Sequence, residues 1–228
     1  MTRDAMRVVV VIGLLLAAAR PARAQLVYEF ANAAGVAQSN FSVPVGSSVA
    51  IRVYIHETSA GAATLNANGG LGTGAVRVTF DNPSGVASVQ ATGDISPGPA
   101  WAFGTPAIDS TSARLVNGSS ITSGVLPDTE GRILLGTFIF QGLAEGSVTL
   151  GALDPNPGVG YDTSSFATSA NIPLTNYDPL LQSATATLTV TPVPEPAALG
   201  LAAAALLAAR RLRRAVRVRS RRSIGTAF

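Results

Sequence analysis

The sequence contains no cysteine and no lysine, and it has one histidine and one tryptophan among 228 residues. Without cysteine, the chain can form neither a disulfide framework nor a thiolate metal site. Without lysine, the glycine-rich stretch 70–74 cannot be a Walker-type phosphate loop, so we expect turn glycines there. His56 has no second histidine to complete a zincin motif. We therefore expect no metal, no cofactor and no catalytic residue, and a fold that depends on its apolar core.

Basic residues are scarce in the middle of the chain. Of sixteen arginines, eight lie between positions 210 and 222, and four precede residue 25. The span 25–193 keeps four arginines against eleven acids, which gives it a net charge of −7. Nucleic-acid binding by this span is disfavoured, because phosphate contacts need clustered cations.

Residues 1–24 have the composition of a secretory signal peptide. Arg3 and Arg7 precede an uncharged run at 8–19, and residues 22–24 supply a small-x-small cleavage site. The run of twelve residues would reach about 18 Å as a helix, whereas the hydrocarbon core of a bilayer is roughly 30 Å thick. We expect export and cleavage after residue 24, with an uncleaved anchor as the alternative.

Between the two ends, apolar and polar residues alternate with period two in several segments, as they do in half-buried strands. No stretch shows the 3.6-residue apolar stripe of a helix. Eight segments are predicted to be strands: 26–30, 48–56, 75–80, 86–91, 113–116, 132–140, 147–150 and 183–191. The pattern predicts an all-β domain over 25–191, a two-sheet antiparallel sandwich of jelly-roll type. An N-terminal signal helix and a C-terminal apolar helix are expected outside it.

Three long linkers rich in Gly, Pro, Ser, Asn and Asp are expected at 57–73, 92–111 and 151–182. Asn117-Gly118 is a further predicted turn. Residues 154–162 place oxygen ligands at alternate positions, as a calcium loop would. Two prolines and the missing central acid favour a proline-rich turn instead.

Four aromatic residues are candidates for a sugar-binding platform: Trp101, Phe103, Tyr161 and Tyr177. Aromatic rings that are exposed together can stack on sugars. The alternative is that these rings cap the core of the sandwich, as large aromatic side chains usually do. Exposure of all four on one surface would favour a carbohydrate-binding module, whereas convergent acids in a cleft would favour a hydrolase.

The C-terminal segment has three parts in a fixed order, followed by a tail. Residues 192–196 form a proline-rich spacer, 197–209 are uncharged, arginines follow within 210–214, and 215–228 form a basic tail. Thirteen uncharged residues reach about 20 Å as a helix, which is short for a permanent span. Arginines after an apolar segment place that end in the cytoplasm and the middle of the chain outside.

The triplet Pro194-Glu195-Pro196, the apolar run and the arginine cluster resemble the PEP-CTERM sorting signal over residues 193–214. The resemblance implies an exosortase as partner, a membrane protease-transpeptidase that processes the signal and releases or transfers the protein to the cell surface. The sorting-signal residues that it implies are Pro194, Glu195, Pro196, Arg210, Arg211, Arg213 and Arg214. An ordinary C-terminal anchor with a basic flank is the alternative.

The middle of the chain resembles cohesin-like and related carbohydrate-binding sandwich domains in its segments 45–49, 69–81 and 131–138. This resemblance implies a jelly-roll-like sandwich and no activity. The two resemblances together imply an exported surface or extracellular-matrix protein, anchored transiently in the inner membrane by its C-terminus. The sandwich would have a structural, adhesive or binding role. Its expected partners are the exosortase-type protease, the membrane before processing, and a polysaccharide or another surface protein.

Overall fold

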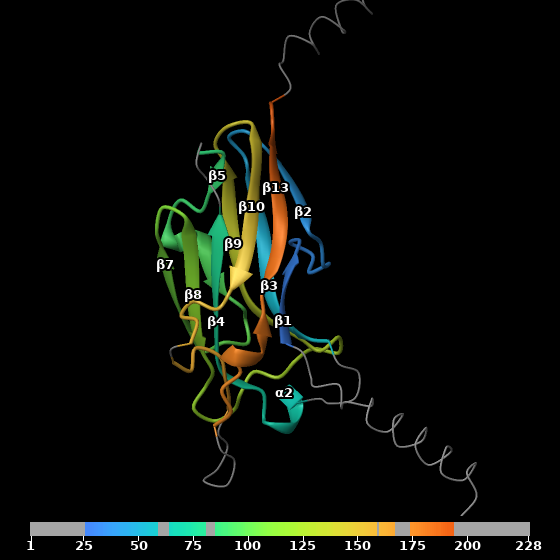
Figure 1. Cartoon of the computed structure of the whole chain (residues 1–228), viewed down its shortest axis with the longest axis vertical. Helices are drawn as coiled ribbons and strands as arrows, with labels where there is room; N and C mark the ends of the chain where they lie inside the picture. The colour runs from blue at the N-terminus through green and yellow to red at the C-terminus, as the bar shows by residue number, and fades with distance from the viewer. Residues whose placement is uncertain (1–25, 59–63, 81–84, 159, 167–173, 194–228) are drawn as a thin grey trace, which may run out of the picture. The chain divides into compact units, whose positions relative to one another are not determined.

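The computed structural model describes residues 26–58, 64–80, 85–158, 160–166 and 174–193. Their strands form two sheets, so the all-β sandwich expected from the sequence is confirmed (Figure 1). One compact unit of the chain ends at Thr191, and a second begins at Pro192. The expected signal helix and C-terminal helix lie outside the described residues. Within the described ranges, no helix is long and apolar enough to cross a membrane.

The first sheet, called sheet A here, is built around two long strands, β3 (Ser48–Glu57) and β9 (Arg132–Gly142). Its strand order is β12-β1-β3-β9-β5, and β6 also pairs with β9. The remaining strands are β1 (Leu26–Ala31), β5 (Ala87–Ser88), β6 (Ile95–Pro97) and β12 (Leu181–Gln182). The β3–β9 register shifts between Val53 and Tyr54, and such a bulge bends the strand and increases its local twist.

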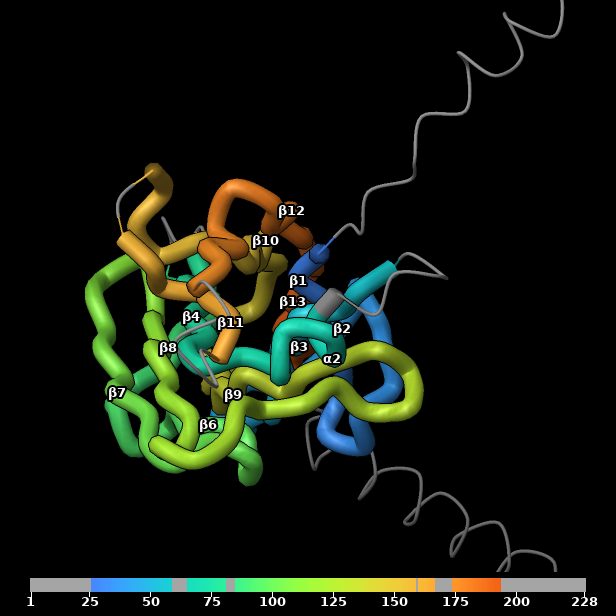
Figure 2. Tube along the Cα trace, turned by 90° about the horizontal axis from the view of Figure 1, so that it is seen from below, coloured from blue at the N-terminus to red at the C-terminus, as the bar shows by residue number. Residues whose placement is uncertain are grey.

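The second sheet, sheet B, has the strand order β2-β13-β10-β4-β8-β7, and β11 also pairs with β4. Its strands are β2 (Asn40–Pro44), β4 (Leu71–Phe80), β7 (Phe103–Ile108), β8 (Ser112–Gly118), β10 (Gly146–Leu153), β11 (Ser164–Ser165) and β13 (Ala184–Thr191). Figure 2 shows β7 and β8 at one side of the sandwich and β2 away from them, as this order requires. The helical elements of the described chain are α2 (Thr64–Ala67) and 3₁₀ turns at Thr92–Asp94 and Asp178–Leu180.

The core lies between the two sheets because each strand turns one set of alternate side chains inward. In β4, Val76, Val78 and Phe80 are buried, and β13 follows the same pattern. Phe80 of sheet B meets Phe140 of sheet A edge to face, with ring centroids 5.7 Å apart and planes at 88°. Aromatic pairs prefer this geometry. The intervening positions, such as Arg77 in β4, therefore lie on the outer faces.

The expectation of a purely antiparallel sandwich is wrong at two sheet edges. β1 pairs with β12 in parallel, and β13 pairs with β2 in parallel. Each pair joins segments far apart in the sequence, and β2 and β12 are only five and two residues long. Such short edge strands leave too little alternation to be recognised in the sequence.

Two further expectations about loops are wrong. The predicted linker 92–111 contains β6 and β7, and Pro106 is accepted in β7 because an edge strand does not need every N–H. The predicted turn at Asn117-Gly118 lies inside β8 instead. Asn117 is 1% exposed, and its Nδ2 donates a hydrogen bond of 3.0 Å to the carbonyl of Leu135. A buried partner for the amide thus outweighs the local preference for a turn.

Candidate functional site

The predicted sorting-signal residues, at 194–196 and within 210–214, lie outside the described residues. Their recognition by an exosortase therefore stays a prediction. The structure does give the boundary of the domain: β13 ends at Thr191, and only Pro192 and Val193 separate it from Pro194. Removal of the chain from Pro194 onward would leave every described strand intact.

Two of the four aromatic candidates belong to the core. Trp101 is 6% exposed, and its Nε1 donates a hydrogen bond of 2.8 Å to the carbonyl of Leu134. Its ring packs so closely on Gly74 that a Cβ there would lie 2.7 Å from Trp101 Cη2. Tyr177 is fully buried, and its hydroxyl accepts a hydrogen bond of 2.7 Å from Asn68 Nδ2. Both side chains bury their rings and satisfy their polar atoms, as core-capping aromatics do.

The other two aromatic candidates, Phe103 and Tyr161, are exposed. The Phe103 ring covers Gly118, its cross-strand neighbour in β8, so any side chain at position 118 would collide with it. Tyr161 lies in the loop after β10, where its carbonyl accepts a hydrogen bond of 3.0 Å from Thr73 Oγ1. The four rings do not share one exposed surface, and sugar stacking on Phe103 or Tyr161 stays a prediction.

His56 takes part in a charged cluster on the outer face of sheet A. Its Nδ1 lies 2.9 Å from Glu29 Oε2, and Arg132 Nη1 lies 3.3 Å from Glu29 Oε1. Arg132 also pairs with Glu130 at 2.6 Å and lies over the ring of Tyr54, 4.8 Å from its centroid. Each of these ionisable groups has a partner within the cluster. The cluster therefore ties β1, β3 and β9 together.

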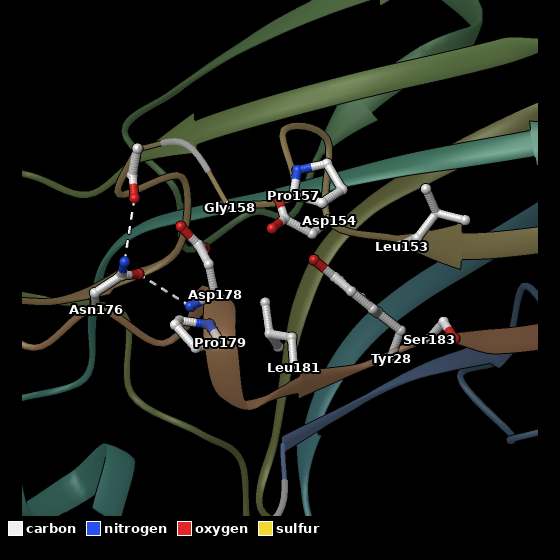
Figure 3. A pocket seen from close by; sticks show the side chains of 11 residues that line it. Tyr28, Leu153, Asp154, Pro157, Gly158, Asn176, Asp178, Pro179, Leu181 and Ser183 are labelled. Carbon is white, nitrogen blue, oxygen red and sulfur yellow. Dashed lines mark hydrogen bonds between the residues drawn. The ribbon is translucent and has the colours of Figure 1, made fainter.

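A cavity of about 460 Å³ lies beside the loop that follows β10 (Figure 3). Its polar lining includes Tyr28, Asp154, Asn176 and Asp178. The Asp178 carboxylate accepts hydrogen bonds from the backbone N–H groups of residues 162 and 163, at 3.1 and 2.8 Å. Asn176 Nδ2 donates to the carbonyl of Gly160 at 3.1 Å, and its Oδ1 accepts from the Asp178 N–H at 3.0 Å. These contacts hold the turns that wall the cavity.

Burial shifts the pKa of two ionisable groups that line this cavity, Asp178 and Tyr28. Burial raises the pKa of Asp178, the hydrogen bond from the Thr163 N–H opposes the rise, and the charge of Asp154 adds to it. Burial also raises the pKa of Tyr28, with further increases from the charges of Asp154 and Asp178. The Tyr28 phenol is therefore a neutral donor, and it bonds to the carbonyl of Ala75 at 2.9 Å.

Asp154 and Asp178 line one cavity, which is the arrangement that a hydrolase would need. Asp178, however, is committed to two backbone amides of a turn. Asp154 likewise accepts a hydrogen bond of 3.0 Å from the N–H of Asn156 in its own turn. In the part of the chain that the structure describes, no group of three His, Cys, Asp or Glu residues is placed to hold a metal ion. The geometry assigns these acids to turn structure.

A second cavity, of about 290 Å³, opens over the outer face of sheet B. Arg77 in β4 and Arg114 in β8 are direct cross-strand neighbours, and both line it. Neither side chain has a hydrogen bond or ion pair to any residue within the described ranges, and Arg77 Nε is buried without a partner. The pair could not be predicted from the sequence, because only the β4–β8 register brings the two positions together. The sequence does contain one signal: each arginine stands between apolar residues that are buried, which indicates that both arginines lie on the outer face of a sheet.

Beside the arginine pair, the outer face of three adjacent strands, β2, β13 and β10, carries hydroxyl groups and no charged residue. We call this surface the hydroxyl face. It consists of Ser42, Ser147, Thr149, Thr185, Thr187, Thr189 and Thr191. Thr189 lies between Ser42 and Ser147 in register, and its Oγ1 is 3.4 Å from Ser147 Oγ. Strands about 4.8 Å apart thus present rows of donors and acceptors to the outside.

No protein-family model and no curated protein sequence matches the chain. The solved structures that it resembles include cohesin modules, the domains also suggested by segments 45–49, 69–81 and 131–138. One is the cohesin module of a family 33 glycoside hydrolase from Clostridium perfringens, with 9% identity and a TM-score of 0.45 over 75% of this chain and 99% of the module. The sixth cohesin of Acetivibrio cellulolyticus scaffoldin B, solved in complex with a dockerin, has 10% identity and a TM-score of 0.44, covering 74% and 99%.

A third is the second type II cohesin module of the ScaA scaffoldin from the same organism, with 13% identity and a TM-score of 0.42 over 78% of this chain and 96% of the module. Identities and TM-scores this low transfer neither a ligand nor a partner from these modules to this chain. Its function has to be argued from its own surfaces.

Proposed function

We propose that the chain is an exported surface or matrix protein whose β-sandwich is a non-catalytic binding module. The observation that carries the proposal is the hydroxyl face, an uncharged polar surface across three adjacent strands of sheet B. An enzyme site needs a nucleophile, acid or base that is free to act in a cleft. His56 and Asp178, by contrast, are engaged by Glu29 and by turn amides.

A polysaccharide of the cell surface is the ligand that the hydroxyl face supports best. Serine and threonine hydroxyls both donate and accept hydrogen bonds, and sugar hydroxyls do the same. A paired sheet holds these groups in rows, so ordering them on binding costs little conformational entropy. An extended, hydroxyl-rich chain could therefore pair with several rows at once.

Charge placed in the centre of the hydroxyl face tests this role. The double variant Thr187→Glu, Thr189→Glu should bind isolated cell-surface polysaccharide at least tenfold more weakly than the wild-type full chain. Thr92→Glu is the matched control, because Thr92 is exposed in the turn that leads into β6 of sheet A. Binding by the double variant at the wild-type level would refute the assignment. The assignment would also fail if the wild-type chain, incubated with a cell-surface extract, retained protein but no polysaccharide.

We further propose that an exosortase-type enzyme processes the C-terminal segment. Two observations support this: the Pro-Glu-Pro triplet, apolar run and arginines occur in order, and the compact unit ends at Thr191 just before them. The apolar run is rich in alanine, which buries little area at about 25 cal/mol per Å². It is therefore a poor permanent anchor but sufficient as a transient stop.

Glu195→Ala tests the processing signal. The variant should fold and be exported normally but accumulate uncleaved in the membrane fraction, since only recognition by the processing enzyme is lost. Glu145→Ala is the matched control, because Glu145 is an exposed acid in the turn between β9 and β10. If Glu195→Ala fractionated like the wild type, Glu195 would have no part in processing.

A further inference from the structure

Arg77 and Arg114 form an unfavourable pair as the chain stands. They lie directly opposite each other in the β4–β8 ladder, and like charges in that position destabilise a sheet. Arg77 Nε is in addition buried without a hydrogen-bond partner. Buried polar groups are almost always satisfied, so an unsatisfied one calls for an explanation. The missing partner for both guanidinium groups is a negative charge.

The domain contains more than enough acidic residues to give both arginines an ion-pair partner. Span 25–193 carries eleven acids against four arginines. Arg132 alone lies within 4.0 Å of Glu29, Asp128 and Glu130, whereas Arg77 and Arg114 have no acid at that distance among the described residues. Arg132 thus has three acidic partners, whereas Arg77 and Arg114 have none among the described residues.

The carboxylate that does line the same cavity, Asp109, is already engaged. It accepts hydrogen bonds from Ser112 Oγ and from the Ser112 N–H, both at 2.6 Å, and from the Thr111 N–H at 2.8 Å. These bonds, led by that from the Ser112 hydroxyl, lower the pKa of Asp109. Asp109 therefore closes the turn between β7 and β8, and it forms no ion pair with either arginine.

The size and setting of the cavity indicate what kind of anion it would take. Its volume of about 290 Å³ exceeds that of a bare ion and lies near the lower limit for small-molecule sites, roughly 300 Å³. Besides the arginines, the cavity is lined by Asn156, whose Nδ2 donates to Asp162 Oδ2 at 2.6 Å, and by the apolar surface of Ala107 and Pro155. A sugar ring that bears an acidic group has this mixture of features.

The cavity and the hydroxyl face lie on the same outer face of sheet B. One row of cross-strand neighbours runs from Thr185 in β13 through Gly151 in β10 and Thr79 in β4 to Ser112 in β8. Thr185 belongs to the hydroxyl face, and Ser112 lines the cavity. A polysaccharide lying along this row would bring its sugar units from neutral hydroxyl partners to the two guanidinium groups.

We propose that Arg77 and Arg114 bind the carboxylate of a uronic acid unit, so that the ligand of the sandwich is an acidic polysaccharide. The planar fork of a guanidinium group matches a carboxylate in a bidentate geometry. Two such groups from neighbouring strands clamp it from two sides, and the bound anion relieves their mutual repulsion. This inference rests on the proposed function and adds the charge class of the ligand.

Calorimetric titration of the full chain with trigalacturonate tests the site. The wild type should bind it, and the fully methyl-esterified trimer, which has the same size without the charges, should bind at least tenfold more weakly. Raising the salt from about 0.1 M to about 1 M shortens the Debye length from about 10 Å to about 3 Å, so binding should weaken further. Absence of wild-type binding, or equal binding of the ester, would overturn the proposal.

Arg77→Gln and Arg114→Gln should each weaken trigalacturonate binding about tenfold or more, since each removes a charge-assisted clamp. Arg52→Gln is the matched control: Arg52 lies in β3 of sheet A, lines neither cavity and has no ion pair within the described ranges. Both cavity variants should melt no lower than the wild type, because a like-charge pair has been removed. Variants that bind as the wild type does would contradict the assignment.

Two comparisons separate the possible anions and the two proposals. Inorganic sulfate or a sulfated neutral sugar that binds more tightly than trigalacturonate would overturn the uronate assignment. If the chain is exported and bound to a neutral surface polysaccharide but not to trigalacturonate, this inference fails while the proposed function stands. If the chain is not exported, the proposed function fails whatever the titration shows.

Discussion

Trp101→Ala should destabilise the sandwich strongly, because the ring belongs to the core and not to a binding surface. Truncation of a buried tryptophan typically costs about 3–5 kcal/mol of unfolding free energy. The loss includes the part-buried hydrogen bond from Nε1 to the Leu134 carbonyl, and such a bond contributes about 0.5–1.5 kcal/mol net. A domain with about 5–15 kcal/mol of total stability would lose a large share of it.

The assay for this prediction is equilibrium urea unfolding of the exported protein, followed by circular dichroism. Fluorescence is unsuitable, since Trp101 is the only tryptophan in the chain. Phe103→Ala is the matched control: its ring is 61% exposed and covers Gly118 from outside, so its removal should cost less than about 1 kcal/mol. A Trp101→Ala protein within about 1 kcal/mol of the wild type would refute the core assignment.

Three further predictions concern packing and pH. Gly74→Ala places a methyl group 2.7 Å from Trp101 Cη2 and 2.9 Å from Leu135 Cδ2 and should cost about 1–3 kcal/mol in urea unfolding; the share due to the Trp101 ring should vanish in the Trp101→Ala background, and a fully additive cost would contradict the contact. Burial raises the pKa of Tyr28 in the folded state, so the wild type should lose stability more steeply than Tyr28→Phe as pH rises above about 10, and parallel alkaline unfolding curves would refute this. The raised pKa of Asp178 gives the wild type an advantage that is complete below about pH 3.9 and lost as pH rises through the folded pKa. The free energy of unfolding of Asp178→Asn, relative to the wild type, should therefore increase from about pH 3 to about pH 7. If the difference in unfolding free energy between the two proteins did not change with pH, the pKa of Asp178 would not be raised.

The sequence predicts those strands whose apolar pattern is long and uninterrupted, alternating in β3 and β13 and more continuous in β9. β3, β9 and β13 begin and end within a few residues of the predicted segments. β7 was beyond prediction because Gly104 and Pro106 interrupt its pattern, and both are tolerated only because the strand is at an edge. Whether a strand lies at an edge is a property of the assembled sheet, which the local sequence does not contain.

The same distinction holds for the candidate site: some of its features follow from the local sequence, and others exist only in the folded sheet. The composition alone excluded a thiolate metal site and a Walker-type phosphate loop. The positions of the charged residues located the acidic excess in the span 25–193. The burial of Trp101 depends on Gly74, and the arginine pair depends on the register that sets Arg77 beside Arg114. Both are contacts between strands that are distant in the sequence, so neither follows from the residues around it.

Intact-mass measurement of the protein recovered from the cell surface is the decisive test of export and C-terminal processing. We expect a chain that begins after residue 24, ends near the Pro194-Glu195-Pro196 triplet and lacks the arginine cluster. A surface protein that is intact through Phe228 would contradict it, and the C-terminal segment would then be a plain anchor.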